Sequence, residues 1–378
     1  TITSAATLTL SDLTEITSLD YGPSSSRIYS VCWSPDGKFL AIGGSTPTST
    51  YELQVYSFNG SSLNLVDSRN YGSGIDSVSW SSDGRFLAIG GSTPTSTYEL
   101  QVYLFNGSSL ELVDSKDYGT SILSVSWSPD GRFLAIGGQK SGDELEVYSF
   151  NGSSLTLVDS KDYGTAISSV TWNPDGRFLA IGGQKTGDEL EVYSFNGSSL
   201  TPVDSKDYGT SILSVSWSPD GRFLAIGGQK TGDELEIYSF NGSSLNLIDS
   251  KDYGTRIYSV SWSSDGRFLA IGGQKTGDEL EIYSFNGSSL NLIDSMDYGT
   301  SIESVSWSPD GRFLAIGGYQ PIIGTELQVY RSNFGPDLQT QALSNSVVFS
   351  DLKNGIDPDA KICVLGGADI ILDGYICV

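Results

Sequence analysis

The sequence contains no histidine among its 378 residues, and it contains only three cysteines and one methionine. Histidine is the usual general base of enzymes and the commonest metal ligand, so its absence removes Ser-His-Asp and Cys-His constellations. Basic residues are also scarce, because 21 lysines and arginines stand against 45 aspartates and glutamates, for a formal net charge of −24. A nucleic-acid-binding protein needs a basic face, so we expect no nucleic acid among the partners.

Long apolar runs are absent as well. No run approaches the roughly 18 apolar residues that indicate a membrane-spanning helix, so we expect no membrane span. The chain begins at Thr1 without a charged-then-apolar leader. We interpret it as either a mature form whose leader has been removed or an excised fragment. The first interpretation predicts an extracellular or cell-surface location.

What the sequence does contain is an internal repeat. The stretch Ser124–Gly138 recurs, nearly unchanged, seven times. Each copy is anchored by a tryptophan, with spacings of 47, 47, 45, 45, 45 and 45 residues between Trp33, Trp80, Trp127, Trp172, Trp217, Trp262 and Trp307. A period in the 40s with strand-like content is typical of a repeat array.

Each repeat contains four short β-like runs. In the third copy they are residues 122–127, 132–137, 144–150 and 155–160. Pro129-Asp130-Gly131 and Asn151-Gly152 are strong turn signals between runs. Four antiparallel strands in each of seven units predict an all-β fold, a seven-bladed β-propeller.

The two ends of the repeat array complement each other. Residues 13–22 are a divergent copy of residues 155–164, which form the last run of a repeat, whereas the seventh unit stops after three runs. We therefore expect the N-terminal strand to complete the last blade. The predicted organisation is an extended arm at 1–11, the propeller at 12–331 and a β-rich C-terminal tail at 332–378.

The stretch from Val125 to Ala135 resembles the central signature of WD-repeat β-propellers, and the resemblance extends over residues 12–331. The Trp-Asp pair that ends the third strand in that family is Tyr148-Ser149 here, and the family's Gly-His pair is absent. The hydrogen-bond tetrad of many WD repeats is therefore missing. The resemblance implies a non-enzymatic scaffold that binds other macromolecules, although fold alone does not prove function.

The sequence gives only weak signals for catalytic or metal-binding residues. Carboxylate pairs such as Asp143 with Glu144 and Asp188 with Glu189 recur in the repeats, and repeated acids on loops are typical of a solvated face. Asp130-Gly131 superficially suggests a calcium loop, but such loops need several closely spaced oxygen ligands. We therefore expect no enzymatic activity, no cofactor and no metal site.

Two kinds of covalent modification are considered. Asn-Gly-Ser triplets fit either N-glycosylation or, as we favour, hairpin turns, and they begin at Asn59, Asn106, Asn151, Asn196, Asn241 and Asn286. Cys363 and Cys377 lie on two candidate strands of the tail, where they form either a disulfide or two unpaired thiols. Cys32 stands where other repeats have Ser or Thr, so we expect a buried free thiol.

The most informative comparison is among the repeats themselves. Four residues before each tryptophan the residue type is free, whereas the positions five and two before are always Ile and Val. The position six before also varies, and Arg27 and Arg256 are its only charged residues. We predict a partner-binding rim at the channel mouth, formed by Arg27, Tyr29, Asp76, Leu123, Ser168, Leu213, Arg256, Tyr258 and Glu303. Neutral drift at an exposed site is the alternative.

Three functions remain open. The first is a structural subunit that self-assembles into a filament, by strand addition through Thr1–Leu10 and Val347–Val378. The second is an interaction scaffold that binds a protein at the rim, with Tyr29, Leu123, Leu213 and Tyr258 as anchors. The third is a multivalent glycan-binding propeller in which Tyr163 and its equivalents are the sugar platforms.

Overall fold

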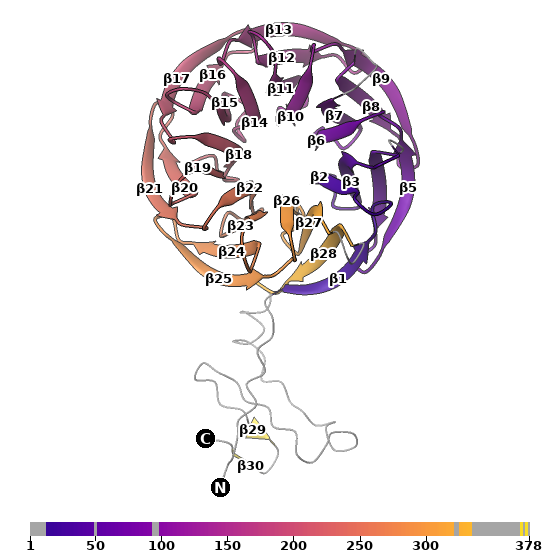
Figure 1. Cartoon of the computed structure of the whole chain (residues 1–378), viewed down its shortest axis with the longest axis vertical. Helices are drawn as coiled ribbons and strands as arrows, with labels where there is room; N and C mark the ends of the chain where they lie inside the picture. Colours follow the sequence, from indigo (N-terminus) through magenta and orange to yellow (C-terminus); the bar gives the residue numbers. More distant parts are fainter. Residues whose placement is uncertain are drawn as a thin grey trace. The chain divides into compact units, whose positions relative to one another are not determined.

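The computed structural model describes residues 13–48, 51–92, 98–320, 325–334, 371–372 and 375–376. Every helix or strand within these residues is a β-strand (Figure 1). No helix in this part of the chain is long and apolar enough to cross a membrane. The all-β expectation is therefore confirmed for the described residues.

Between Leu13 and Ser332 the strands occur in four positions. The innermost are β2 (Arg27–Trp33), β6 (Gly74–Trp80), β10 (Ser121–Trp127), β14 (Ala166–Trp172), β18 (Ser211–Trp217), β22 (Arg256–Trp262) and β26 (Ser301–Trp307). The second are β3 (Phe39–Ser45), β7 (Phe86–Ser92), β11 (Phe133–Gln139), β15 (Phe178–Gln184), β19 (Phe223–Gln229), β23 (Phe268–Gln274) and β27 (Phe313–Tyr319).

The third position is occupied by β4 (Leu53–Phe58), β8 (Leu100–Phe105), β12 (Leu145–Phe150), β16 (Leu190–Phe195), β20 (Leu235–Phe240), β24 (Leu280–Phe285) and β28 (Leu327–Ser332). The outermost strands are β5 (Leu63–Arg69), β9 (Leu110–Lys116), β13 (Leu155–Lys161), β17 (Leu200–Lys206), β21 (Leu245–Lys251), β25 (Leu290–Met296) and β1 (Leu13–Leu19). Pro202, which cannot donate to a strand ladder, is exposed on the outermost strand β17.

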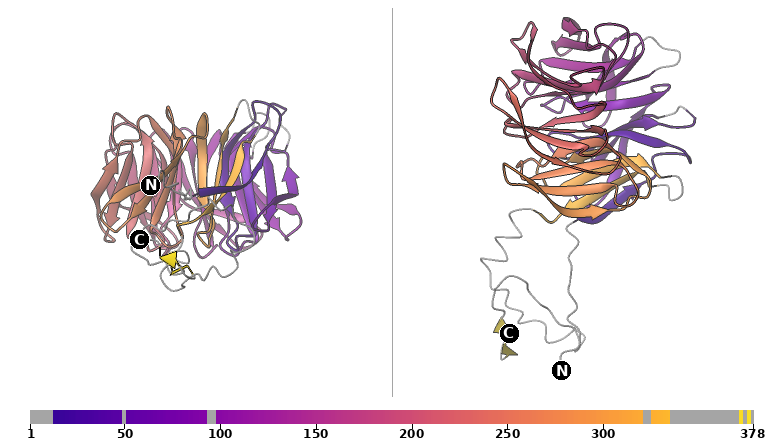
Figure 2. Two further views of the ribbon diagram at one scale, coloured as in Figure 1. Left: turned by 90° about the horizontal axis from the view of Figure 1, so that it is seen from below. Right: turned by 60° about the vertical axis from the view of Figure 1, so that its left-hand side comes forward.

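Consecutive strands pair antiparallel into four-stranded blades, for example β10 with β11, β11 with β12 and β12 with β13. The last three strands form one sheet with the first, in the order β1-β28-β27-β26, so the N-terminal strand completes the last blade as predicted. The 28 strands of this region fit seven blades of four. Figure 1 shows them arranged in a ring with the innermost strands facing its centre, and Figure 2 shows the blades standing side by side when seen edge-on.

Apolar side chains pack the blades against each other. Ile167, Val170 and Trp172 of one blade share a buried cluster with Ala135 and Leu145 of the preceding blade. Complete burial of a side chain of the size of Ile or Leu contributes about 1.5–3 kcal/mol. Because the same residues recur in every repeat, this contact is repeated at every junction between successive blades.

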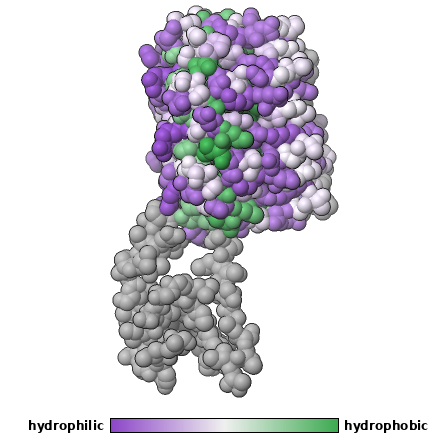
Figure 3. All heavy atoms as spheres, turned by 90° about the vertical axis from the view of Figure 1, so that its left-hand side faces the viewer, coloured by the Kyte–Doolittle hydropathy of each residue, from purple (hydrophilic) through white to green (hydrophobic). Residues whose placement is uncertain are grey.

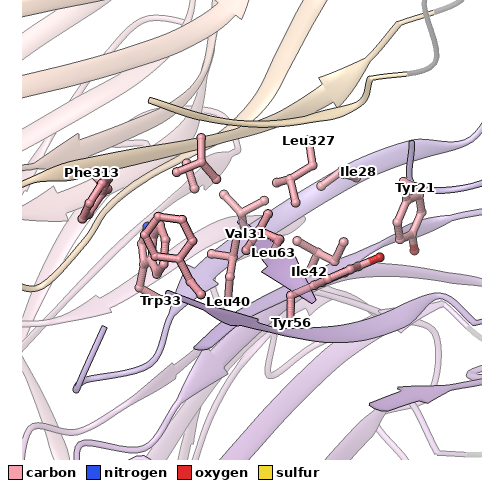
Figure 4. Close-up of a cluster of buried hydrophobic side chains, with 13 residues drawn as sticks. Tyr21, Ile28, Val31, Trp33, Leu40, Ile42, Tyr56, Leu63, Phe313 and Leu327 are labelled. Atoms are coloured by element: carbon pink, nitrogen blue, oxygen red, sulfur yellow. The ribbon is translucent and has the colours of Figure 1, made fainter. Parts of the chain in front are cut away.

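The last blade packs against the first in the same manner. Val31 and Trp33 of β2 lie in one buried cluster with Phe313 and Leu327 of the last blade (Figure 4). The indole nitrogen of Trp33 also donates a hydrogen bond of 3.1 Å to the carbonyl oxygen of Ser306. The two ends of the array are therefore joined by an ordinary blade–blade contact.

The paired glycines at the end of the second strand permit this close approach. A Cβ atom on Gly137 would lie 2.8 Å from the side chain of Val170 in the next blade, and closer still to Ile167. A Cβ atom on Gly138 would overlap the carbonyl oxygen of Ser121. Side chains at either position would push neighbouring strands apart, which explains the recurrence of Gly-Gly in every copy.

Two compact units can be separated by their contacts. One comprises Glu15–Arg331, and the other comprises Thr1–Thr14 with Ser332–Val378. In the C-terminal part of the second unit, β29 (Ile371–Leu372) pairs antiparallel with β30 (Tyr375–Ile376). The predicted extended arm at 1–11 and most of the tail at 332–378 lie outside the described ranges.

Candidate partner-binding site at the channel mouth

A β-bulge occurs near the start of every innermost strand. In β10 the register with β11 shifts between Ile122 and Ser124, so Leu123 has no partner across the ladder. The same shift occurs at the corresponding residues of the other innermost strands. A bulge re-aims one side chain and leaves it outside regular pairing. The bulged residue is the one whose type varies from repeat to repeat.

The nine rim residues predicted from the sequence all lie on innermost strands, at or beside the bulge. Every one of them is half-buried rather than exposed. Figure 1 shows these strands around the centre of the ring. A half-buried position tolerates substitutions less freely than the exposed site that neutral drift assumes.

The rim residues divide into two arcs. Tyr258, Glu303, Tyr29 and Asp76 occupy the bulges of four successive innermost strands, β22, β26, β2 and β6. Small or apolar residues occupy the other three bulges, and they are Leu123, Ser168 and Leu213. The structure therefore does not bring the four predicted anchors together, because the two tyrosines lie on one arc and the two leucines on the other.

Two arginines flank Glu303 on the polar arc. The guanidinium of Arg27 lies 4.6 Å from the ring centroid of Tyr319, across the junction between the first and last blades. The guanidinium of Arg256 donates a hydrogen bond of 3.2 Å to the hydroxyl of Tyr258. Both arginines are thus fixed by aromatic side chains at the channel mouth.

Glu303 lies in the electrostatic field of both arginines. Burial raises the pKa of its carboxyl, while a hydrogen bond from Ser301 and the charges of Arg27 and Arg256 oppose that rise. The Ser301 hydroxyl donates to Glu303 Oε1 at 2.9 Å. No ion pair within 4.0 Å joins Glu303 to either arginine in the described structure.

Asp76 is the other carboxyl of this arc. Burial raises the pKa of Asp76 to about 7. Within the described residues no ion pair compensates the charge that Asp76 would carry when ionised. A half-buried acid of this kind is a common feature of binding sites, although structural groups show it too.

Buried glutamates between the blades were not anticipated. Glu144 is only 1% exposed, and its Oε2 accepts hydrogen bonds from the backbone N–H groups of Tyr163 at 2.7 Å and Gly164 at 3.1 Å. Although burial raises the pKa of Glu144, these backbone hydrogen bonds lower it below the usual value. Equivalent buried glutamates recur at Glu52, Glu99, Glu189, Glu234, Glu279 and Glu326.

The solvated-face interpretation of the carboxylate pairs is therefore wrong for their glutamates. Asp143 is exposed as expected, whereas Glu144 joins one blade to the start of the next. The sequence signal was present, because the glutamate and the following Tyr-Gly recur together. Charge alone suggested an exposed position, since burial of an ionised carboxylate requires partners that the sequence does not display.

The tyrosines proposed as sugar platforms are also buried. Tyr163 is 4% exposed, and its hydroxyl donates to the carbonyl oxygen of Glu189 at 2.6 Å. Its equivalents are buried in the same way, at Tyr21, Tyr71, Tyr118, Tyr208, Tyr253 and Tyr298. A ring covered on both sides cannot stack on a sugar, so this part of the glycan-binding prediction is wrong.

The Asn-Gly-Ser triplets form hairpin turns. Asn151 is exposed, and its Oδ1 accepts hydrogen bonds from the backbone N–H groups of Ser153 and Ser154, both at 2.9 Å. Gly152 has a φ of 91°, which favours glycine at that position. The turn interpretation is confirmed, and glycosylation of these asparagines stays a prediction.

The aspartates of the Asp-Gly turns also accept hydrogen bonds from within their own turns. Asp130 Oδ1 accepts hydrogen bonds from the Ser128 hydroxyl at 2.6 Å and from the Arg132 backbone N–H at 3.1 Å. Hollows open between neighbouring blades beside these turns, and one of about 600 Å³ is lined by Asp130, Phe133 and Phe195. Among the described residues, no group of three or more Cys, Asp or Glu side chains is arranged to hold a metal ion.

The cysteines fall into two groups. Cys32 is a free thiol on β2, and its burial raises the pKa of the thiol. Cys363 and Cys377 lie outside the described residues, so their disulfide stays a prediction. The strands proposed for self-assembly, Thr1–Leu10 and Val347–Val378, also lie outside the described residues, apart from the short β29–β30 hairpin.

Comparison with known proteins identifies similar sequences and folds. Residues 92–253 and 227–351 match the family model of eukaryotic translation initiation factor eIF2A, and residues 13–46 match that of the WD domain, G-beta repeat. The two eIF2A matches overlap at 227–253, so this stretch belongs to both matches. This is expected when blades are nearly identical.

No curated protein matches the sequence. A similar solved structure is a chain of the mitotic checkpoint complex, which is 17% identical and superposes with a TM-score of 0.66. The superposition covers 85% of this chain and 95% of that chain. At this identity the likeness shows the fold alone.

Proposed function

Because the chain belongs to the WD-repeat β-propellers, with the eIF2A family model matching the larger part of it, we propose that it is a non-enzymatic scaffold that binds another protein at the mouth of its channel. The overlapping eIF2A matches reflect the blade sequence, so the proposal rests on the propeller and not on translation initiation. The partner would contact the rim residues.

The observation that carries this proposal is variation at the bulge in an otherwise near-identical array. Residues 121–132 and 211–222 are identical, and the other copies change mainly at the bulged residue and its neighbour two positions earlier. A half-buried bulge re-aims a side chain without disturbing the ladder on either side. Such positions can change the chemistry of a surface while the blades stay the same.

The rim would need a rigid support, and we propose that a closed ring of seven blades provides it. Two features favour this arrangement. The sheet that contains β1 and β26–β28 links the two ends of the array, and the cluster around Trp33 and Phe313 packs the last blade on the first.

The test compares two sets of substitutions in the full chain. The rim variant combines Tyr29→Ala, Leu123→Ala, Leu213→Ala and Tyr258→Ala. The control removes four leucines of the outermost strands, each more than half exposed, by Leu65→Ala, Leu112→Ala, Leu247→Ala and Leu292→Ala. Figure 3 shows apolar patches scattered between hydrophilic side chains on one side of the ring.

Partners would be captured from an extract of the source cells, cross-linked and quantified by mass spectrometry. We expect one partner to be retained by the native chain and the control, and to be reduced at least tenfold with the rim variant. Thermal unfolding of all three proteins shows whether the ring is intact. Equal retention by the native and the folded rim variant would refute binding at the rim.

A further inference from the structure

Among the described residues, ion pairing separates three arginines from the other cations. Most lysines and arginines of the described residues lie within 4.0 Å of a carboxylate. Within those residues the exceptions are Arg27, Arg256 and Arg331. In a chain with a net charge of −24, a cation without a carboxylate partner is unexpected.

Two of these three arginines occupy the same position in different blades. Arg27 and Arg256 stand at the first residue of β2 and β22, two residues before the bulge, where the other innermost strands have Gly, Ser or Ala. They flank β26, which carries Glu303. Arg331 is different, because it is exposed near the end of β28 and its guanidinium lies 5.9 Å from the ring centroid of Phe313.

The local charge balance around β26 favours an additional anion. Arg27 and Arg256 both act on Glu303, whereas burial favours the protonated form of Asp76, the other carboxyl of this arc, so the two guanidinium groups are not fully neutralised. One carboxylate oxygen of Glu303 moreover accepts a hydrogen bond from the Ser301 hydroxyl. Guanidinium groups bind carboxylates and phosphates through parallel N–H···O bonds, and their planar shape is already oriented here by Tyr319 and Tyr258.

The same side of the ring carries longer connections. The segments between second and third strands are residues 46–52, 93–99 and 320–326 in the blades of β2, β6 and β26, two residues longer than the corresponding 140–144, 185–189, 230–234 and 275–279. Arg27 pairs with Ser45 at the end of β3, so these connections leave the end of the blade at which the rim lies. The longer connections therefore belong to three of the four blades of the polar arc, those of β26, β2 and β6.

We propose that Arg27 and Arg256 together bind an anionic group of the partner, a carboxylate or a phosphate, at the channel mouth beside β26. The proposal rests on the function proposed above and adds the chemistry of the partner. Tyr29 and Tyr258 would contact the apolar part of the segment that carries this anion. Glu303 would compete with the anion for the two guanidinium groups.

Isothermal titration calorimetry on the full chain tests this assignment with two probes, inorganic phosphate and succinate. We expect the native chain to bind at least one of them, and the probe that binds more tightly distinguishes a phosphate from a carboxylate partner. The double variant Arg27→Gln/Arg256→Gln should weaken binding at least tenfold. The matched control Arg331→Gln should bind as the native chain does.

Glu303→Gln should change the affinity for the probe in the direction opposite to the double arginine variant. It keeps an acceptor for Ser301 and removes the competing charge, so we expect binding of the same probe to become several-fold tighter. The proposal would be overturned if the native chain bound neither probe, or if the double arginine variant, still folded by its thermal transition, bound as tightly as native.

Capture of the protein partner separates this proposal from the proposed function. If the rim variant loses the partner and the double arginine variant retains it, the anion site is wrong and the rim scaffold stands. If the rim variant also retains the partner, the scaffold function is wrong, whatever the probes show. Loss of the partner in both variants, together with loss of the probe in the arginine variant, supports both proposals.

Discussion

Asp76 is the residue of the rim whose ionisation should be visible in the stability of the whole ring. Burial raises the pKa of its carboxyl to about 7 in the folded protein, from an ordinary value of 3.8. The fold therefore favours the protonated acid. Stability from this preference is fully present below about pH 4 and is lost as the pH rises through about 7.

Asp76→Asn should remove that loss. The amide has the same shape and no charge, so we expect the variant to exceed the native chain in free energy of unfolding at pH 8.5, by at most about 4 kcal/mol. At pH 4 the two should be similar. Urea unfolding at both pH values measures the difference, and Asp162→Asn, at an exposed aspartate, is the control. A difference that does not depend on pH would show that Asp76 ionises normally.

Glu144 should contribute to stability through its hydrogen bonds. Glu144→Ala leaves the N–H groups of Tyr163 and Gly164 without an acceptor, and each unsatisfied buried group costs about 1–3 kcal/mol. Glu144→Gln retains one carbonyl oxygen and should lose less. We expect urea midpoints in the order native, Gln, Ala, with Asp143→Asn unchanged. An unchanged midpoint for Glu144→Ala would mean that water replaces the carboxylate.

Residue identity singles out the positions of the proposed rim but not their geometry. Variation among near-identical copies singles out residues such as Tyr29 and Leu123 without any structure. That these residues are bulged follows from pairing between strands, which a local pattern does not specify. Burial of Glu144 and Tyr163 was missed for a related reason, because each depends on hydrogen-bond partners in the next blade.

At the scale of the element, the sequence was sufficient to predict where most strands lie. The runs expected at 122–127 and 155–160 correspond to β10 and β13 within one residue at each end. Turn glycines fix these ends, since Gly131 and Gly152 have φ values of 68° and 91°. The role of the N-terminal strand was also predictable, because the last repeat lacks a fourth run.

β1 nevertheless differs from the strands that it replaces. In the outermost strands β5, β9, β13, β17 and β21 an aspartate reaches the next blade, as when Asp114 Oδ2 accepts a hydrogen bond of 2.6 Å from the backbone N–H of Leu155. The corresponding residue of β1 is Thr17. The junction between the last and first blades therefore lacks this aspartate.

Thr17→Asp should restore the missing connection. A carboxylate at this position would accept a hydrogen bond from Leu63, the first residue of the next outermost strand, and we expect a gain of about 1 kcal/mol in the free energy of unfolding. Thr156→Asp, at an exposed threonine of β13, introduces the same charge without the hydrogen bond and should give no gain. Equal effects of the two substitutions in thermal or urea unfolding would contradict this account.

At the scale of the whole molecule, repetition itself makes the fold predictable and the function obscure. Each blade buries the same residues against its neighbour, so one repeat predicts the ring. The proposed function depends on the few positions that differ, and only the assembled ring places Arg27, Arg256 and Glu303 near one another. A single repeat contains no information about that arrangement.

Self-assembly through the terminal segments is a prediction independent of the rim. The β29–β30 hairpin has two residues in each strand, and an isolated two-stranded hairpin is marginal in water because its edges lack partners. Pairing with strands of a second copy would satisfy those edges, and head-to-tail contacts of this kind extend into filaments without closing.

Removal of residues 1–10 and 345–378 should therefore abolish polymers and leave the ring intact. We expect ordered polymers of the full chain by electron microscopy, and a monomeric ring with unchanged thermal unfolding for the trimmed chain by light scattering. Arg27→Gln/Arg256→Gln serves as a control, because it should assemble as the full chain does. If the full chain is monomeric over the same concentration range, strand exchange is wrong and the rim remains the proposed site of interaction. Polymers that persist after trimming would instead place the contact on the ring, where the exposed leucines of the outermost strands are the first surface to substitute.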